Sequence, residues 1–287
     1  MMHLAWGART DLGRVRSANE DAHLAEPPVF VVSDGMGGHA AGGVASAIVV
    51  DEFRRCAGAA TVESDWVAGC VARAGTRIRR LSGGGATVVG VALVEQSGTP
   101  YWLAFNLGDS RVYRSTGGVL EQVSVDHSLV QELVDAGELE PHLARTHPRR
   151  NVITRAVGVA GPSHPDCWLL PGVQGDRFLL CSDGVTGELT DGRLAEILAA
   201  CPDPQQAADA LVAEAVRAGG RDNATAVVVD VVTVAPGTAG GDLTRSGPGG
   251  RLVIPQAGTD AAGEDTRPRR GAGAAELSIG GRGAEPA

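Results

Sequence analysis

Residues 29–43 read Val-Phe-Val-Val-Ser-Asp-Gly-Met-Gly-Gly-His-Ala-Ala-Gly-Gly, and residues 178–184 read Phe-Leu-Leu-Cys-Ser-Asp-Gly. Each stretch is a short apolar run, typical of a strand, that ends in Ser-Asp-Gly. The end of a strand determines where the carboxylates of Asp34 and Asp183 point, and the glycine after each lets the backbone approach an ion closely. Either copy alone is more simply explained as a turn, and only together with other carboxylates do the two copies indicate a site.

Further runs rich in β-branched and aromatic residues predict strands, at residues 86–94, 101–107, 111–114 and 224–232. The runs 101–107 and 111–114 flank Gly-Asp-Ser and are expected to form a hairpin. Apolar residues at helical spacing predict helices, over residues 42–56, 61–81, 191–200 and 203–218. Because strands and helices do not alternate one by one, we expect an α+β fold with antiparallel sheets covered by helices, and not a parallel doubly wound sheet.

Two more carboxylates, Asp109 and Asp222, lie beside predicted strands. If the four strand ends converge, these side chains raise each other's pKa unless cations lie between them. The candidate ligands are all oxygen atoms, which favours Mg²⁺ or Mn²⁺ over Zn²⁺. Two such ions suit a phosphate ester substrate, because they reverse the repulsion of the phosphate and can activate a water for in-line attack.

Arg16 and His39 are the candidates for handling the phosphate. Arg16 lies four residues before Glu20, and a guanidinium there could hold two phosphate oxygens. His39 follows the first Ser-Asp-Gly and could protonate a leaving alkoxide. Simpler alternatives stay open at this point: Arg16 as a solvated arginine that nothing local separates from Arg14, and His39 as a helix-entry residue facing water.

The composition excludes several other classes. The chain has 287 residues and a net charge of −9, which disfavours nucleic-acid binding by a broad basic face. All 25 basic residues are arginine, which excludes lysine-based covalent chemistry and a P-loop lysine. No apolar run approaches the ~20 residues of a membrane helix, and a secretory pattern is absent from the first ten residues. We therefore expect a cytoplasmic protein without membrane insertion, whose cysteines are reduced.

The net charge sits on residues 1–234, a stretch one domain in length. Residues 235–287 differ, because their Gly-, Pro- and Ala-rich runs show little apolar periodicity. We expect a folded domain over 1–234 and a disordered tail over 235–287.

Together the separate strings resemble the type 2C, metal-dependent Ser/Thr protein phosphatases (the PPM family) in their bacterial form. The strings occur in the family's order and cover roughly residues 5–232. They are Arg-Ser-Ala-Asn-Glu-Asp (16–21), Val-Ser-Asp-Gly-Met-Gly-Gly-His-Ala-Ala-Gly (32–42), Gly-Ala-Thr-Val (85–88), Asn-Leu-Gly-Asp-Ser-Arg (106–111), Asp-His-Ser (126–128), Cys-Ser-Asp-Gly (181–184) and Gly-Arg-Asp-Asn-Ala-Thr (220–225). Any one string alone is a weak signal, whereas the ordered set is specific.

The resemblance implies a type 2C catalytic domain over residues 1–234, built as a four-layer α-β-β-α sandwich with two central antiparallel β-sheets flanked by helix pairs. It also implies that a water bridging two Mn²⁺ or Mg²⁺ ions attacks phosphoserine or phosphothreonine directly, without a phosphoenzyme.

The resemblance carries roles over to individual residues. The matching metal ligands are Asp34 as the bridging ligand, Gly35 through its carbonyl, Asp183 and Asp222, with Glu20 and Asp21 holding metal-bound waters. Arg16 matches the phosphate-binding arginine, His39 the candidate general acid, and Asp109 a ligand of a weaker third metal. Some members carry an acidic residue where this chain has Gly187, and its absence weakens the third site. Residues 127–160 match a flap that we expect to contact the substrate protein.

The first hypothesis is a phosphatase that opposes a Ser/Thr protein kinase, with phosphorylated proteins as its substrates. A catalytically silent regulator that binds phosphoproteins is disfavoured, because Asp34, Asp183 and Asp222 are all present. A hydrolase of small phosphate esters stays open, because the same metal chemistry would serve it.

Overall fold

The structure is a computed structural model that describes residues 2–37, 41–56, 58–63, 65–81, 83–161 and 163–234. Within them lie two antiparallel sheets. The five-stranded sheet has the order β1-β11-β10-β7-β8 and comprises β1 (Met2–Asp11), β7 (Arg111–Thr116), β8 (Val119–Gln122), β10 (Arg177–Cys181) and β11 (Ala224–Val234). The six-stranded sheet has the order β2-β3-β5-β6-β9, with β4 paired to β3, and comprises β2 (Asp21–Glu26), β3 (Val29–Met36), β4 (Gly85–Ala86), β5 (Val88–Gln96), β6 (Thr99–Leu107) and β9 (Asp166–Pro171).

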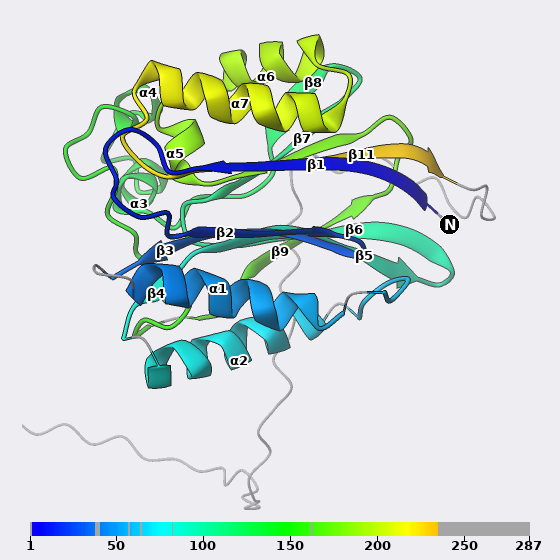
Figure 1. Cartoon of the computed structure of the whole chain (residues 1–287), viewed down its shortest axis with the longest axis horizontal. Coiled ribbons are helices and arrows are strands. Elements are labelled where there is room, and N and C mark those ends of the chain that lie inside the picture. The colour runs from blue at the N-terminus through cyan, green and yellow to red at the C-terminus, as the bar shows by residue number, and fades with distance from the viewer. Residues whose placement is uncertain are drawn as a thin grey trace, which may run out of the picture. The chain divides into compact units, whose positions relative to one another are not determined.

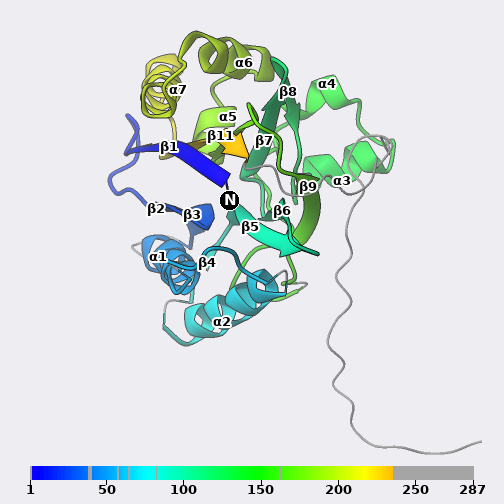
Figure 2. The same cartoon turned by 90° about the vertical axis from the view of Figure 1, so that its right-hand side faces the viewer.

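Helices cover the outer faces of both sheets (Figure 1). The pair α1 (Ala41–Arg54) and α2 (Trp66–Leu81) covers the six-stranded sheet, and the pair α6 (Asp191–Ala200) and α7 (Pro204–Ala218) covers the five-stranded sheet. Short helices α3 (Leu129–Asp135), α4 (Pro141–Ala144) and α5 (Asp183–Thr186) lie at one end of the sheets, on the left in Figure 1, and Figure 2 views the sandwich from the opposite end. This arrangement confirms the expected α+β fold with two antiparallel sheets between helix pairs.

Inner strands such as β10 are almost wholly apolar because they are buried on both faces. Along β10, Phe178 and Leu180 belong to the core between the two sheets, whereas Leu179 and Cys181 belong to the core beneath α6 and α7. The inner core contains a ring contact between the sheets, with the centroids of Trp102 and Phe178 5.3 Å apart. Strands in this position therefore appear in the sequence as continuous apolar runs, without alternation.

The expected hairpin between residues 101–107 and 111–114 is wrong. Strand β6 pairs with β5 and β9 in the six-stranded sheet, whereas β7 pairs with β8 and β10 in the five-stranded sheet. The intervening turn crosses from one sheet to the other, and Gly108 adopts a φ of +126° within it. The turn therefore places Asp109 between the layers and not at the tip of a hairpin.

All five cysteines are free in the structure. In the part of the chain that the structure describes, no helix is long and apolar enough to cross a membrane. The tail expected over residues 235–287 lies outside the described residues.

Candidate metal centre

Both sheets contribute carboxylates to one end of the sandwich. In the six-stranded sheet, Asp21 at the start of β2 pairs directly with Asp34 on β3. From the five-stranded sheet, Asp183 begins α5 immediately after β10, and Asp222 precedes β11. The charges of Asp21, Asp183 and Asp222 all act on Asp34. The carboxylates of Asp34, Asp183 and Asp222 therefore lie close enough to interact electrostatically.

Burial is the main cause of the raised pKa values of the carboxyl groups in this cluster. It raises the pKa of Asp34 well above the ordinary value, and the charges of Asp21 and Asp183 raise it further. Burial, followed by the charge of Asp222, raises the pKa of Asp183 to about 6. Burial also raises the pKa of Asp21 to about 7. Carboxylates with such pKa values resist ionisation together unless positive charge compensates them.

Several carboxylate oxygens in the cluster are buried without a hydrogen-bond partner. These are Oδ1 of Asp21, Oδ1 of Asp109 and Oδ1 of Asp183. The other oxygen of Asp21 accepts hydrogen bonds from Ser182 Oγ at 2.8 Å and Thr225 Oγ1 at 2.6 Å. An unpartnered buried oxygen is costly, and oxygen ligands of this kind are what Mg²⁺ and Mn²⁺ take. The residues present therefore fit a hard divalent cation.

The side chains are not already arranged around an ion. Among the described residues, no group of three His, Cys, Asp or Glu side chains could hold a metal as placed. Asp222 Oδ2 instead accepts a hydrogen bond from Arg16 Nη2 at 2.5 Å. Arg16 therefore supplies positive charge beside the Asp222 carboxylate in this arrangement.

The structure separates Arg16 from Arg14, which the sequence does not. The pKa of Arg16 is raised, first by its hydrogen bond to Asp222 and also by the charges of Asp34 and Asp183. Its side chain is 52 % exposed, so the guanidinium lies at the cluster and also faces solvent. Arg14, by contrast, is held by its backbone, whose N–H donates to the Gly220 carbonyl at 2.7 Å.

The glycine after each Ser-Asp is required by packing. A Cβ on Gly35 would lie 2.1 Å from the Gly42 carbonyl oxygen at the start of α1, and a Cβ on Gly184 would lie 1.9 Å from the Asn223 carbonyl oxygen. The backbone of Gly35 also donates to the carbonyl of Glu20 at 3.2 Å. These contacts hold the segments of the cluster against one another.

Hydroxyl and amide side chains support the carboxylates, and the sequence reasoning assigned them no role. Asn223 Nδ2 donates to the carbonyls of Leu12 and Ala18, while its Oδ1 accepts from the Glu20 N–H at 2.8 Å. Thr87 Oγ1 accepts from the Asp34 N–H at 2.9 Å. Thr87 and Asn223 lie in the family-like strings 85–88 and 220–225, and this was the sequence feature that could have indicated their role.

Of the remaining candidates, Asp109 joins the cluster. Burial raises its pKa well above the ordinary value, and the charge of Asp183 adds to this. Glu20 contributes through its backbone, since its carbonyl also accepts from Ser46 Oγ at 2.5 Å. His39 lies outside the described residues.

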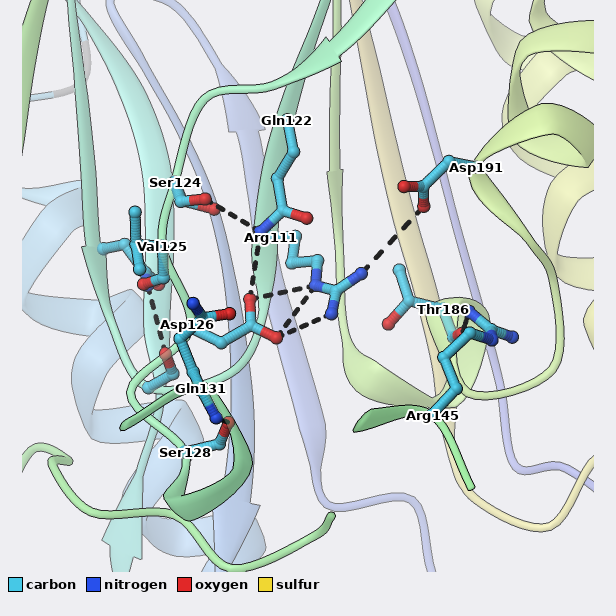
Figure 3. A network of polar contacts seen from close by, with 12 residues as sticks. Arg111, Gln122, Ser124, Val125, Asp126, Ser128, Gln131, Arg145, Thr186 and Asp191 are labelled. Carbon is cyan, nitrogen blue, oxygen red and sulfur yellow. Dashed lines mark hydrogen bonds and ion pairs between the residues drawn. The ribbon is translucent and has the colours of Figure 1, made fainter. Parts of the chain in front are cut away.

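Arginines link several segments at this end of the sandwich (Figure 3). Arg111 binds Asp126 through Nε and Nη2, with the shortest contact at 2.7 Å. Arg145, directly after α4, donates to the carbonyl of Thr186 in α5 at 2.9 Å (Figure 3). The segment 127–160, expected to form the flap, thus contacts the helix that begins with Asp183.

Comparison with known proteins gives consistent matches over this region. The sequence model of the family described as Protein phosphatase 2C matches residues 14–213. The Ser/Thr phosphatase stp of Listeria innocua is 35 % identical over 240 residues, which span 77 % of this chain and 94 % of that protein. A crystal structure of the Mycobacterium tuberculosis Ser/Thr phosphatase PstP/Ppp matches with a TM-score of 0.73 and 33 % identity, covering 80 % of this chain and 99 % of that one. A structure of the PstP catalytic domain in complex with two manganese ions matches with a TM-score of 0.70 and 32 % identity, with the same coverage.

Proposed function

This chain belongs to the bacterial protein phosphatase 2C (PPM) family of Ser/Thr protein phosphatases, and we propose that it hydrolyses phosphoserine and phosphothreonine by direct attack of water at a two-metal centre. The observation that carries this proposal is the convergence of the partly buried carboxylates of Asp34, Asp183 and Asp222 beside the half-exposed guanidinium of Arg16. We assign this activity to a catalytic domain over residues 1–234.

The proposed ion ligands are Asp34, the Gly35 carbonyl, Asp183 and Asp222, with Glu20 and Asp21 acting through water. When bound, two Mn²⁺ or Mg²⁺ ions would neutralise the carboxylates and activate a water for attack on phosphorus. The solved relative that contains two manganese ions supports this assignment. A weaker third ion at Asp109 is supported by that residue's unpartnered Oδ1, although Gly187 adds no ligand.

The chain's own side chains would handle the ester. Arg16 would bind two phosphate oxygens through its planar guanidinium, in exchange for its hydrogen bond to Asp222. His39 would donate a proton to the leaving serine or threonine oxygen as the P–O bond breaks. The products are inorganic phosphate and the free hydroxyl, and no covalent intermediate forms on the protein.

For the biological setting, we propose a cytoplasmic enzyme that opposes a Ser/Thr protein kinase. The flap at 127–160 would contact the protein substrate. Its hydrogen bond to α5 through Arg145 supports this role, because it places the flap beside the helix that begins with Asp183.

The decisive experiment measures phosphate release from a panel of phosphopeptides and nucleotides, with Mn²⁺ and with a chelator. We expect Mn²⁺-dependent release from phosphothreonine and phosphoserine peptides and little from nucleotides. Release that persists in the chelator would refute the metal mechanism. Faster turnover of nucleotides than of phosphopeptides would favour a hydrolase of small phosphate esters.

A further inference from the structure

Glu188 and Arg221 form a side-chain link between the two segments that carry Asp183 and Asp222. Glu188 Oε1 accepts from the Arg221 backbone N–H at 3.2 Å and from Arg221 Nε at 2.8 Å. Glu188 Oε2 accepts from Arg221 Nη2 at 3.0 Å. One carboxylate thus engages the backbone and the guanidinium of a single residue, which is the neighbour of Asp222.

Each end of this link belongs to a short, well-anchored unit. On one side, Gly187 N–H donates to the Asp183 carbonyl at 2.6 Å and Glu188 N–H to the Val185 carbonyl at 3.2 Å, so Glu188 follows α5 in a continuous turn from Asp183. On the other side, the N–H groups of Gly219 and Gly220 both donate to the Ala215 carbonyl at the end of α7. The link therefore joins two turns, and each turn carries one candidate metal ligand.

Burial distinguishes this pair from an ordinary surface ion pair. The side chain of Glu188 is only 7 % exposed, although that of Arg221 is 63 % exposed. The backbone makes room for the carboxylate, because a Cβ on Gly219 would lie 2.6 Å from Glu188 Oε2. Exposed ion pairs contribute little to stability, whereas a buried carboxylate that loses its donors is costly. The buried Glu188 carboxylate therefore holds Arg221 at a defined position relative to α5.

We propose that Glu188 is a positioning residue for the metal centre, which acts through Arg221 to hold the Asp222 turn at a defined distance from Asp183. This inference rests on the proposed function, because it assumes that Asp183 and Asp222 share an ion. Glu188 touches neither the ion nor the substrate in this role. It limits how far the Asp222 carboxylate can move when it exchanges Arg16 for a cation.

The test is Mn²⁺ binding to the full chain without substrate, measured by isothermal titration calorimetry. The variants are Arg221→Gln, whose side chain is mostly exposed, Glu188→Gln, and the double variant. Loss of an outer partner of a metal ligand typically weakens metal affinity 10–100-fold, and we expect about tenfold for each single variant. The double variant should bind no more weakly than the weaker single variant, because both substitutions break the same link.

The matched control is Arg193→Gln. Arg193 also binds a glutamate, Glu214, through Nε and Nη2, and this pair joins α6 to α7 without either candidate ligand. We expect Mn²⁺ affinity of this variant to stay within about twofold of the wild type. Unchanged affinity in both Arg221→Gln and Glu188→Gln would overturn the positioning role and leave the metal centre intact. A wild-type chain that binds no Mn²⁺ would overturn the proposed function and this role together.

Discussion

Arg16 Nη2 donates a hydrogen bond to Asp222 Oδ2 at 2.5 Å, which joins two residues 206 positions apart in the sequence. The contact places the guanidinium at the carboxylate cluster, where the charges of Asp34 and Asp183 also act on it. The sequence does not distinguish Arg16 from Arg14, whereas the hydrogen bond to Asp222 does. The cluster therefore includes a positive group that is half exposed to solvent.

Replacing Arg16 by lysine should impair phosphate binding. Lysine keeps the charge but cannot offer two parallel N–H groups, and loss of one charge-assisted hydrogen bond costs about 1.5 kcal/mol. We expect kcat/KM for a phosphothreonine peptide to fall about tenfold, measured by phosphate release. The control is Arg14→Lys, which should stay within about twofold of the wild type. Equal losses in both variants would remove the phosphate-binding role from Arg16.

Asp183→Ala should abolish Mn²⁺-dependent turnover, because it removes a proposed ligand from the cluster. The loss should exceed the roughly 100-fold that an outer partner can account for. A chelator should reduce the wild type to the same level. Steady-state phosphate release measures both effects, and normal turnover in the variant would rule out Asp183 as a ligand.

In the presence of a chelator, which removes the metal ions, the protein should lose stability as pH rises because the carboxyl groups of the cluster ionise. The folded-state pKa of Asp183 is raised to about 6 and that of Asp21 to about 7, both above the unfolded value near 4. The folded state therefore binds more protons than the unfolded state in this window, so the free energy of unfolding falls from about pH 4 to pH 7.

The comparison of wild type with Asp183→Asn isolates this contribution from other titrating groups. Urea unfolding at several pH values in a chelator should show the wild type losing more stability than the variant between pH 4 and 7. With Mn²⁺ the wild type should regain the loss, because the ions bind the ionised carboxylates. A wild type that gains stability relative to the variant over this window would contradict the assignment.

His39→Gln should separate substrates by their leaving groups. An alkyl phosphate needs a proton on its departing oxygen, whereas p-nitrophenolate leaves without one. We expect a lower kcat on phosphoserine or phosphothreonine peptides, by about 10²-fold, and little change on p-nitrophenyl phosphate. Equal losses on both substrates would exclude His39 as the general acid.

The sequence by itself determined the central strands, the long helices and the identity of the acidic residues. Residues 29–32 and 178–181 are buried on both faces, so the apolar pattern along the chain reports their position directly. The four strands that the sequence reasoning missed, β1, β2, β8 and β9, all lie at sheet edges. An edge strand is partly exposed and mixes polar with apolar residues, so its local pattern is weak.

Only the tertiary structure decided which segments meet. It assigned β6 and β7 to different sheets, because each strand finds its partners in remote strands and not in its neighbour along the chain. It also placed Arg16, and not Arg14, against Asp222, and it paired Glu188 with Arg221. Local sequence encodes burial and turn chemistry over a few residues, whereas the partner of a charged side chain depends on which distant backbone the packed core brings beside it.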